Sequence, residues 1–353
     1  MRIGRIRLGQ APPPGLEGAV LTRDLDVTGE RWAKGRRLTS GDLERVASAL
    51  PQAIGRSITV LVPEAGDIHE DDAARRITQA VAGSGLASSE PAQSRIDLRA
   101  THAGLVRINV AVLDRVNAID SVEVFTILDG RIVETGALVA SVKVAPHLIP
   151  DAQVTSAERT GAGAGQRGAI SVAPFRPRRV AAIVKESIRG IARDRFEASI
   201  RAKVEGLGSS LVGIDYVDDA VGPVAAALRA RARGRAPGRA DLILTAGSGS
   251  TDPEDPFFVA LASLGGSIVS HGIPAHPGSM LWLGKLGHVP VLGLPSCGAY
   301  AKATAADLLL PRLLAGAPAS RRTIARLGHG GILTRDQRFR FPPYARELDT
   351  PDG

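Results

Sequence analysis

The 353-residue sequence predicts an α/β protein: a C-terminal doubly wound, mostly parallel sheet preceded by an α+β N-terminal region. Three observations support this fold class. The run VAAIV at 180–184 is entirely apolar, as expected for a parallel strand buried on both faces. Helical periods and short apolar runs then alternate as far as residue 314, which predicts successive βαβ units. Before them lies a stretch rich in glycine and small residues, ERTGAGAGQRGAIS.

That glycine-rich stretch sets the predicted domain boundaries. We expect an α+β region at 1–155, a linker at 156–174 and the doubly wound domain at 175–318. A polar, loosely held extension is expected at 319–353. The sequence leaves the role of 1–155 open, and a surface for a partner or for regulation is one expectation.

The N-terminal region alternates short apolar runs with two helical periods. A helix is predicted at 40–50, with Ser40 as its cap, and a second at 70–83, whose first turn is acidic. The apolar runs predict strands at 19–21, 58–62, 106–112, 122–128 and 137–144.

The C-terminal region shows the stronger rhythm of strands and helices. Strands are predicted at 180–184, 210–217, 241–245, 268–269, 280–283 and 289–292. Helices are predicted at 195–207, 221–232, 256–264 and 304–314. Strands separated by helices in this way favour a parallel sheet with helices on both faces.

Composition narrows the class of partner and the compartment. The net charge of +8 favours anionic partners, but aromatic residues are only 3%, so stacking platforms for nucleic acid are scarce and nucleic-acid binding is not favoured. The sequence has no run of eighteen uninterrupted apolar residues, so no membrane span is predicted. Cys297 is the one cysteine, which excludes an internal disulfide and fits the cytoplasm.

The stretch LILTAGSGSTDPEDPFF at 242–258 combines features typical of a ligand site. An apolar strand ends abruptly in a loop of small residues, which lets backbone N–H groups approach an anion closely. In a doubly wound sheet, ligands sit beyond the carboxyl ends of the strands, where this loop belongs. Asp255 before Pro256 predicts a helix start, whose partial positive charge would face the loop.

Composition alone leaves two interpretations of this loop open. In one, backbone donors and carboxylates bind a ligand that has both a phosphate and polar ring atoms. In the other, the loop is a tight strand-to-helix turn and Asp255 is only a helix cap. The spacing matches neither a Walker motif nor the GxGxxG fingerprint, so it does not decide between them.

A series of motifs between 213 and 316 resembles a known family. GIDYVDDA is followed by DLILTAGSGSTDPED, then by LGGSIVSHGIPAHPGSM and VLGLPSCGAYAK. This order of a strand with an acidic turn, a small-residue loop, a Pro-Gly pair and a Gly-Leu-Pro turn is similar to the molybdopterin-binding domain. Molybdopterin adenylyltransferases, molybdenum insertases and the competence-damage-inducible proteins share that domain.

A subgroup of molybdopterin-binding proteins, some of them fused to a cytidylyltransferase-like domain, looks closer still. It has two neighbouring aspartates in the loop, like Asp252 and Asp255, and a Gly-Leu-Pro-Gly-Cys turn followed by lysine, like GLPSC and Lys302. The sequence also departs from the insertases. Their Pro-Gly-Lys-Pro is PGSM at 277–280, so their lysine is missing. Pterin binding therefore carries over better than metal insertion.

The resemblance implies a set of site residues. The acidic candidates for catalysis are Asp218, Asp219, Asp252 and Asp255. Asp218, Asp219 and Asp255 have the alternative role of helix caps. The expected cofactor-binding residues are Thr245, Gly247, Ser248, Gly249, Ser250, Pro277, Gly278, Ser279, Pro295, Ser296, Cys297 and Lys302. No metal ligands are identified. For Cys297 a contact with the cofactor's sulfurs or metal and quiet burial both stay open.

The implied function is binding of molybdopterin or the molybdenum cofactor, in biosynthesis, insertion or hand-over of that cofactor. One alternative is an active molybdopterin molybdotransferase or nucleotidyltransferase-like enzyme that uses Mg²⁺. Another is a non-catalytic interaction protein on the same scaffold. The expected partners are an anionic pterin and, by resemblance, molybdoenzymes or cofactor-biosynthesis proteins. A homo-oligomer is expected because relatives form dimers or trimers.

Overall fold

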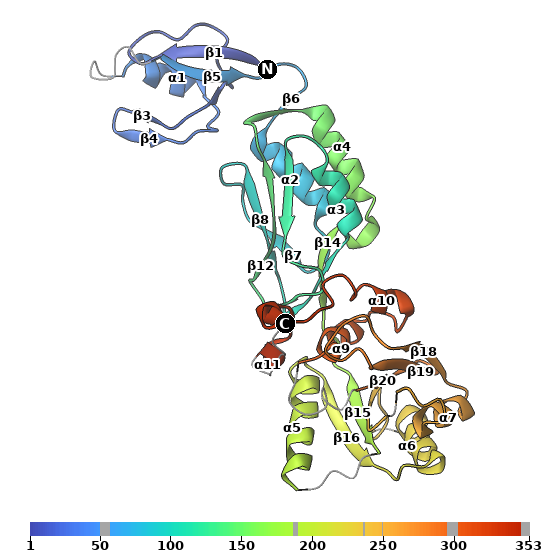
Figure 1. The fold of residues 1–353 in the computed structure, drawn as a ribbon. Coiled ribbons are helices and arrows are strands. Elements are labelled where there is room, and N and C mark those ends of the chain that lie inside the picture. Colours follow the sequence, from blue (N-terminus) through green and yellow to red (C-terminus); the bar gives the residue numbers. More distant parts are fainter. Residues whose placement is uncertain (50–56, 186–189, 236, 249, 295–302, 347–353) are drawn as a thin grey trace. The chain divides into compact units, whose positions relative to one another are not determined.

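The computed structural model describes residues 1–49, 57–185, 190–235, 237–248, 250–294 and 303–346 (Figure 1). The chain forms two compact units. Unit 1 comprises Met1–His102, Val106–Asp129 and Val133–Val172, and unit 2 comprises Ala103–Leu105, Gly130–Ile132 and Ala173–Gly353. In the described part of the chain, no helix has both the length and the apolar character needed to cross a bilayer.

Unit 1 begins with a small antiparallel sheet in which β5 lies between β1 and β2. A β3–β4 hairpin and α1 complete this part, and its apolar core includes Trp32 and Val60. The bounds are β1 Arg2–Arg7, β2 Val20–Leu21, β3 Leu25–Val27, β4 Glu30–Trp32, α1 Ser40–Ala47 and β5 Ser57–Val62.

The rest of unit 1 is built on a four-stranded antiparallel sheet of order β10-β12-β8-β7, with α2, α3 and α4 together on one side (Figure 1). A β13–β6 pair and the strands β11-β9-β14 accompany it. The helices are α2 Glu70–Val81, α3 Val110–Asn117, α4 Asp151–Ala162 and the 3₁₀ turn η2 Gly165–Arg167. The strands are β6 Asp67–His69, β7 Leu86–Ser88, β8 Arg95–Ala100, β9 Gly104–Ile108, β10 Val122–Thr126, β11 Ile132–Val133, β12 Leu138–Val144, β13 Leu148–Pro150 and β14 Ile170–Pro174.

Two local predictions in unit 1 are wrong. Ser40 does not cap α1: the N-cap is Thr39, because Thr39 and Asp42 bond each other's backbone N–H groups in a capping box. The strand predicted at 106–112 ends at Ile108, and α3 follows at once because the side chain of Asn109 caps it. In both places a polar side chain next to an apolar run decides the boundary.

The stretch predicted as a linker, 156–174, instead contains the end of α4, then η2 and β14. Its small residues serve close packing rather than flexibility. A Cβ atom at Gly161 would press on the backbone of Ala80 in α2, and one at Gly168 would press on Gly83. Glycine-rich composition therefore marks close contacts with α2 and its C-terminal end, and not a linker.

Unit 2 contains a six-stranded sheet of order β16-β15-β17-β20-β19-β18. The strands β16, β15, β17 and β20 are mutually parallel, whereas β19 runs antiparallel to β20 and β18. The predicted α/β class with a C-terminal, mostly parallel sheet is therefore confirmed. The strands are β15 Arg179–Val184, β16 Ser210–Tyr216, β17 Leu242–Ala246, β18 Ser267–His271, β19 Trp282–Leu286 and β20 Val289–Gly293.

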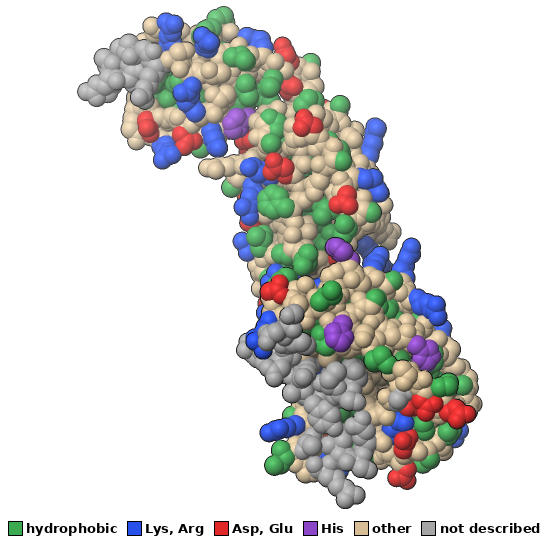
Figure 2. Space-filling model, viewed as in Figure 1, with side chains coloured by type: hydrophobic (Ala, Val, Ile, Leu, Met, Phe, Trp, Pro, Cys, Tyr) green, Lys and Arg blue, Asp and Glu red, His purple; other side chains and the backbone are tan. Residues whose placement is uncertain are grey.

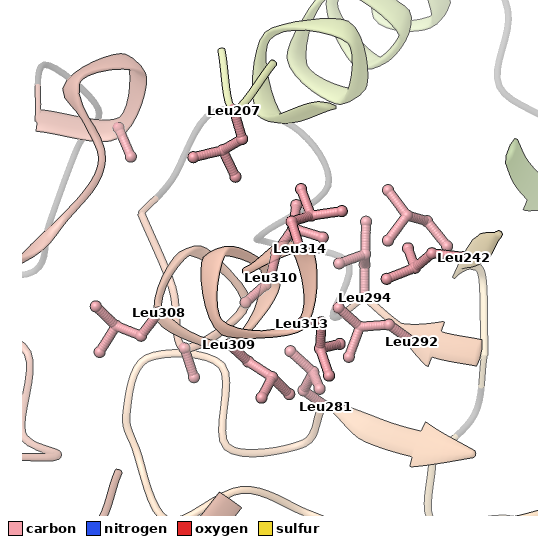
Figure 3. Packing of buried hydrophobic residues seen from close by; sticks show 14 of the residues in the cluster. Leu207, Leu242, Leu281, Leu292, Leu294, Leu308, Leu309, Leu310, Leu313 and Leu314 are labelled. Carbon is pink, nitrogen blue, oxygen red and sulfur yellow. The ribbon is translucent and has the colours of Figure 1, made fainter. Parts of the chain in front are cut away.

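Helices cover both faces of this sheet, with α5 on one side and α6 and α7 on the other (Figure 1). Side chains of β15 alternate between the faces, so that Val184 packs with α5 and α9 while Ile183 packs with α6 and α7. Figure 3 shows leucines of α9 gathered with Leu242, Leu281 and Leu292 of the sheet region. The helices are α5 Ile191–Glu205, α6 Val221–Arg233, α7 Pro256–Ser263 and α9 Ala306–Leu314.

The extension after α9 is packed as far as residue 346, contrary to the expectation of a loosely held tail. It forms α10 Arg321–Ala325, the 3₁₀ turn η3 Arg335–Arg340 and α11 Pro343–Arg346. Ile324, Leu333 and Phe341 are buried in the same cluster as α9. These apolar residues are isolated in a polar sequence, so no periodic pattern announces their burial.

A buried ion pair joins α5 to α9. The Nζ atom of Lys203 lies 2.6 Å from Oδ1 of Asp307, and both side chains are buried. The other carboxylate oxygen of Asp307 accepts a 2.9 Å hydrogen bond from the backbone N–H of Thr304. The ring of Tyr344 in α11 covers Lys203. Burial, together with the negative charge of Asp307, raises the pKa of Tyr344 well above its ordinary value.

Candidate functional site

The strands β15 and β17 are neighbours that end together, with Val184 opposite Ala246. The chain leaves β15 towards α5 on one face and leaves β17 towards α7 on the other. The carboxyl edge of the sheet between two loops that diverge in this way is the usual ligand position in doubly wound folds. We call Lys185, 218–220, 245–248 and 250–255 the switch-point edge.

The loop after β17 begins with a glycine and is anchored by a tryptophan. Gly247 has φ +86°, a conformation that favours glycine. The next residue, Ser248, accepts a 3.0 Å hydrogen bond at Oγ from Nε1 of Trp282. Trp282 lies opposite Gly293 in the β19–β20 pair, and a Cβ atom at Gly293 would collide with the indole. Gly293 therefore makes room for the ring that holds the loop.

Thr245 contributes a buried hydroxyl to this edge. The residue is 1% exposed, and among the described residues its Oγ1 has no hydrogen-bond partner. Its side chain alternates with that of Leu244 and so lies on the face covered by α6 and α7. Leaving such a group unsatisfied costs about 1–3 kcal/mol, so a ligand that pairs with it is favoured.

Lys185, the first residue after β15, lies between two carboxylates. Its Nζ atom is 2.7 Å from Oδ1 of Asp219 and 2.9 Å from Oδ2 of Asp255. The Lys185 side chain is only 5% exposed and that of Asp255 2%, whereas that of Asp219 is 63% exposed. The three side chains come from the segments that follow β15, β16 and β17, which the parallel sheet brings to one edge.

The electrostatic environment keeps Lys185 charged. Burial acts to lower its pKa, but the hydrogen bonds and charges of Asp219 and Asp255 outweigh burial and raise the pKa above its ordinary value. At neutral pH Lys185 is therefore a fixed ammonium group. It can attract an anion or stabilise negative charge, but it cannot accept a proton.

Asp255 is the helix cap that the sequence predicted as one of its two roles, and its other role, as a ligand contact, stays a prediction. Its Oδ1 accepts a 2.9 Å hydrogen bond from the N–H of Phe257 and so caps α7, while its Oδ2 faces Lys185. Asp218 and Asp219 are not caps, because the N-cap of α6 is Ala220 and no side chain bonds there. This finding removes the capping alternative for those two residues.

Asp252 is exposed and turned back on its own loop. Its Oδ1 accepts a 2.9 Å hydrogen bond from the N–H of Glu254, which shapes the turn before α7. Because the second oxygen faces no described partner, Asp252 keeps capacity to accept a hydrogen bond from a ligand.

Pro277 and Gly278 are buried and Ser279 is half-buried, in the loop between β18 and β19. The Pro277 carbonyl accepts a 2.9 Å hydrogen bond from the N–H of Ala305 at the start of α9. Gly278 has φ +100°, and a Cβ atom there would press on Thr304. These contacts hold the loop against the start of α9, and its expected role as the opposite wall of the site stays a prediction.

Some predicted site residues lie outside the described part of the chain. They are Gly249, Pro295, Ser296, Cys297 and Lys302. Their expected contacts with a phosphate or with the cofactor also stay predictions.

Carboxylates outnumber the described cations at this edge. Asp218, Asp219, Asp252, Glu254 and Asp255 lie on its loops with Lys185. Figure 2 shows acidic side chains gathered over the region of α6 and α7. No group of three or more His, Cys, Asp or Glu residues in the described ranges could hold a metal ion by itself. An anionic ligand would therefore bind best together with a cation that offsets this charge.

Sequence reasoning missed Lys185. The signal was present as a lysine directly after the apolar run at 180–184, where a parallel strand delivers its next side chain to the ligand edge. Its partners are 34 residues (Asp219) and 70 residues (Asp255) further along the chain, taking 185 from 219 and from 255. Their proximity follows only from the strand order.

The fold is that of a doubly wound domain, and the point where its loops diverge is the candidate ligand site. Comparison with known families identifies the domain further. Residues 179–315 match the family described as "probable molybdopterin binding domain", so this segment of unit 2 is a domain of that family. The resemblance of this segment to the molybdopterin-binding domain is confirmed, whereas the nearer likeness to the subgroup with a fused cytidylyltransferase-like domain stays a prediction.

Two solved structures are similar to the chain. One is the molybdopterin biosynthesis moea protein from Pyrococcus horikosii, at 16% identity over 74% of this chain and 81% of that one, with a TM-score of 0.30. Another is the molybdopterin biosynthesis enzyme MoaB from Thermus thermophilus, at 20% identity over 40% of this chain and 99% of that one, with a TM-score of 0.28. No curated protein matches the sequence.

Proposed function

We propose that this chain binds molybdopterin or the molybdenum cofactor at the switch-point edge and acts in its biosynthesis, insertion or hand-over. The observation that carries the proposal is the position of this edge inside the matched segment, 179–315. There a small-residue loop, a buried hydroxyl and a buried ammonium meet at the carboxyl ends of β15 and β17.

The polar groups of the edge suit an anionic pterin. The ammonium of Lys185 and the hydroxyl of Thr245 are donors for an oxyanion, as are the backbone N–H groups of the loop after Gly247. The free oxygens of Asp252 and Asp218 are acceptors for ring N–H groups. Donors and acceptors on one edge match a ligand that carries both a phosphate and a polar heterocycle.

The test is titration of the full chain with molybdopterin and, separately, with the molybdenum-loaded cofactor. Thr245→Val removes the unpartnered hydroxyl and keeps the branched shape of the side chain. We expect it to leave the stability of the free protein unchanged or higher and to weaken binding about tenfold, the effect of one lost hydrogen bond to a charged group.

The matched control is Thr78→Val in unit 1, where the hydroxyl is also buried and has no described partner. We expect no change in affinity there. Equal effects of the two substitutions would contradict a site at Thr245. A folded wild type that binds neither form of the cofactor would overturn the proposal and leave a non-catalytic interaction protein on the same scaffold.

The second candidate is an active, Mg²⁺-dependent molybdopterin molybdotransferase. The excess of carboxylates at the edge favours it, because a divalent cation held there with the ligand would offset the charge. Molybdate-dependent release of AMP from adenylylated molybdopterin would establish this activity. If neither Asp252→Ala nor removal of Mg²⁺ changed the rate of AMP release, the switch-point edge would not be the site of this activity.

We further propose that the protein acts in the cytoplasm as a homo-oligomer, beside molybdoenzymes or cofactor-biosynthesis proteins. The single cysteine supports a reducing compartment. Light scattering of the purified chain tests the oligomer, and a monomer over the micromolar range would contradict it.

A further inference from the structure

The two carboxylates on Lys185 are not equivalent. Asp255 is enclosed and has a second structural duty, because its other oxygen caps α7. Asp219 is 63% exposed, and among the described residues its side chain bonds only Lys185. Turning Asp219 outward would therefore break one exposed contact, whereas moving Asp255 would also remove a helix cap.

The surroundings of Asp219 leave room for such a movement. It precedes α6, whose N-cap Ala220 forms no side-chain bond, so α6 loses no cap when Asp219 turns away. Nothing stands within 4 Å of the place where a side chain of Gly222 would begin. The first turn of α6 is thus open at Gly222, and Asp219 itself has 63% of its side chain exposed to solvent.

We propose that Asp219 is a displaceable counter-ion, and that a phosphate group takes its place on the Lys185 ammonium. The identity of the phosphate-bearing ligand rests on the proposed function, whereas the exchange itself does not. The chemistry is that of a phosphate monoester or a nucleotide phosphate, because a dianion pairs with an ammonium more strongly than a single carboxylate does.

This exchange makes the site selective. In the free protein Lys185 is neutralised, so a monoanion such as chloride or acetate gains little by replacing a carboxylate already in place. A dianion gains more, and the displaced Asp219 can turn to solvent. Asp219 therefore sets a threshold of charge that a ligand must exceed.

The first test is titration of the full chain with inorganic phosphate at pH 8, followed by NMR of the lysine ε-methylene groups. We expect Asp219→Ala to tighten phosphate binding about threefold to fivefold, the range of one exposed ion pair. The matched control is Asp218→Ala, which removes the same charge from the same loop but no described side-chain bond. Its effect should stay below about twofold, because solvent and salt screen it.

A third variant shows whether Lys185 is the receptor. Lys185→Met with Asp255→Asn removes both buried charges together, while asparagine keeps the helix cap. In that background Asp219→Ala should no longer tighten phosphate binding. Equal effects of Asp219→Ala and Asp218→Ala would overturn the proposal, and so would tightening that persists without Lys185.

Molybdopterin and AMP form the last arm of the experiment. If wild type binds molybdopterin but Asp219→Ala does not tighten the binding of molybdopterin, AMP or phosphate, the proposed displacement of Asp219 is wrong and the proposed function stands. If Asp219→Ala tightens phosphate or AMP while molybdopterin does not bind, the exchange stands and the proposed function fails.

Discussion

Unit 2 holds lysine ammonium groups against carboxylates in two different surroundings. Lys203 and Asp307 face each other inside the core, between α5 and α9, and both are almost inaccessible to solvent. Lys185 lies at the edge of the sheet, with buried Asp255 on one side and exposed Asp219 on the other. The Lys203–Asp307 pair is enclosed, whereas Lys185 has one partner, Asp219, whose side chain is exposed to solvent.

The difference shows that burial of a charged group does not by itself mark a functional site. The interior pair connects two helices, and both carboxylate oxygens of Asp307 accept hydrogen bonds within the protein. At the edge, a fixed carboxylate holds the ammonium in place while an exposed one neutralises it. The asymmetry of the partners, and not the depth of the lysine, indicates an exchangeable position.

The largest expected effect is that of Lys203→Met. It leaves the Asp307 carboxylate buried without a counter-charge, and the free energy of unfolding should fall by about 3–5 kcal/mol. Urea unfolding followed by circular dichroism measures the change. The double variant Lys203→Met/Asp307→Asn should recover most of it, since asparagine still accepts from Thr304. If the free energy of unfolding fell by less than about 1 kcal/mol, the interior pair would behave like an exposed ion pair, and the difference between the two sites would be wrong.

Lys185→Met should destabilise less, by roughly 2 kcal/mol, because Asp255 keeps its hydrogen bond from Phe257 at the start of α7, where the partial positive charge of the helix offsets part of the lost counter-charge. Unlike the interior substitution, it should also weaken binding of the ligand. The same unfolding experiment applies, with Asp255→Asn as the compensating change. A cost as large as that of Lys203→Met would show that the edge is as enclosed as the core.

Alkaline pH should affect both regions in the same direction. The folded-state pKa values of Lys185 and Tyr344 are raised, so their contributions to stability are complete below about pH 10 and are lost as the pH rises towards the folded-state values. Within that window each group makes stability fall by up to about 1.4 kcal/mol per pH unit. Tyr344→Phe should flatten the profile measured by urea unfolding from pH 9 to 11. An unchanged slope would mean that Tyr344 ionises normally.

The smallest expected effect on stability is that of Asp219→Ala. An exposed ion pair contributes about 0.2–1 kcal/mol, so unfolding should change by less than about 1 kcal/mol while phosphate binding tightens. A larger loss of stability would mean that Asp219 is a structural partner of Lys185 and not a displaceable one.

The sequence predicted the parts of unit 2 that repeat a simple pattern. Runs such as 180–184 are apolar at every position because both faces of a parallel strand are covered, and Asp255 before Pro256 correctly predicted the start of α7. Packed elements without a pattern were missed. A stretch rich in glycine and alanine has the same composition whether it forms a linker or, as here, the close contact of α4 with α2. The buried residues after α9 are too scattered along the sequence to show a period.

The sequence predicted the loop of the candidate site but not the cluster of charged side chains beside it. The loop at 245–251 is continuous in sequence, so its small residues could be read directly. The Lys185 cluster is assembled from the segments that follow three strands, and its geometry depends on β15 lying between β16 and β17. Only the strand order provides that information.

The hydrogen bond from Trp282 to Ser248 gives the protein an optical reporter of its own loop. The chain has two tryptophans, Trp32 and Trp282, so Trp32→Phe leaves a single indole fluorophore. That indole is enclosed, and its N–H is tied to the loop where a ligand is expected. A change of the Ser248 contact would shift its emission wavelength and lifetime. Occupancy of the site could then be followed within milliseconds, without a label and before the ligand is identified.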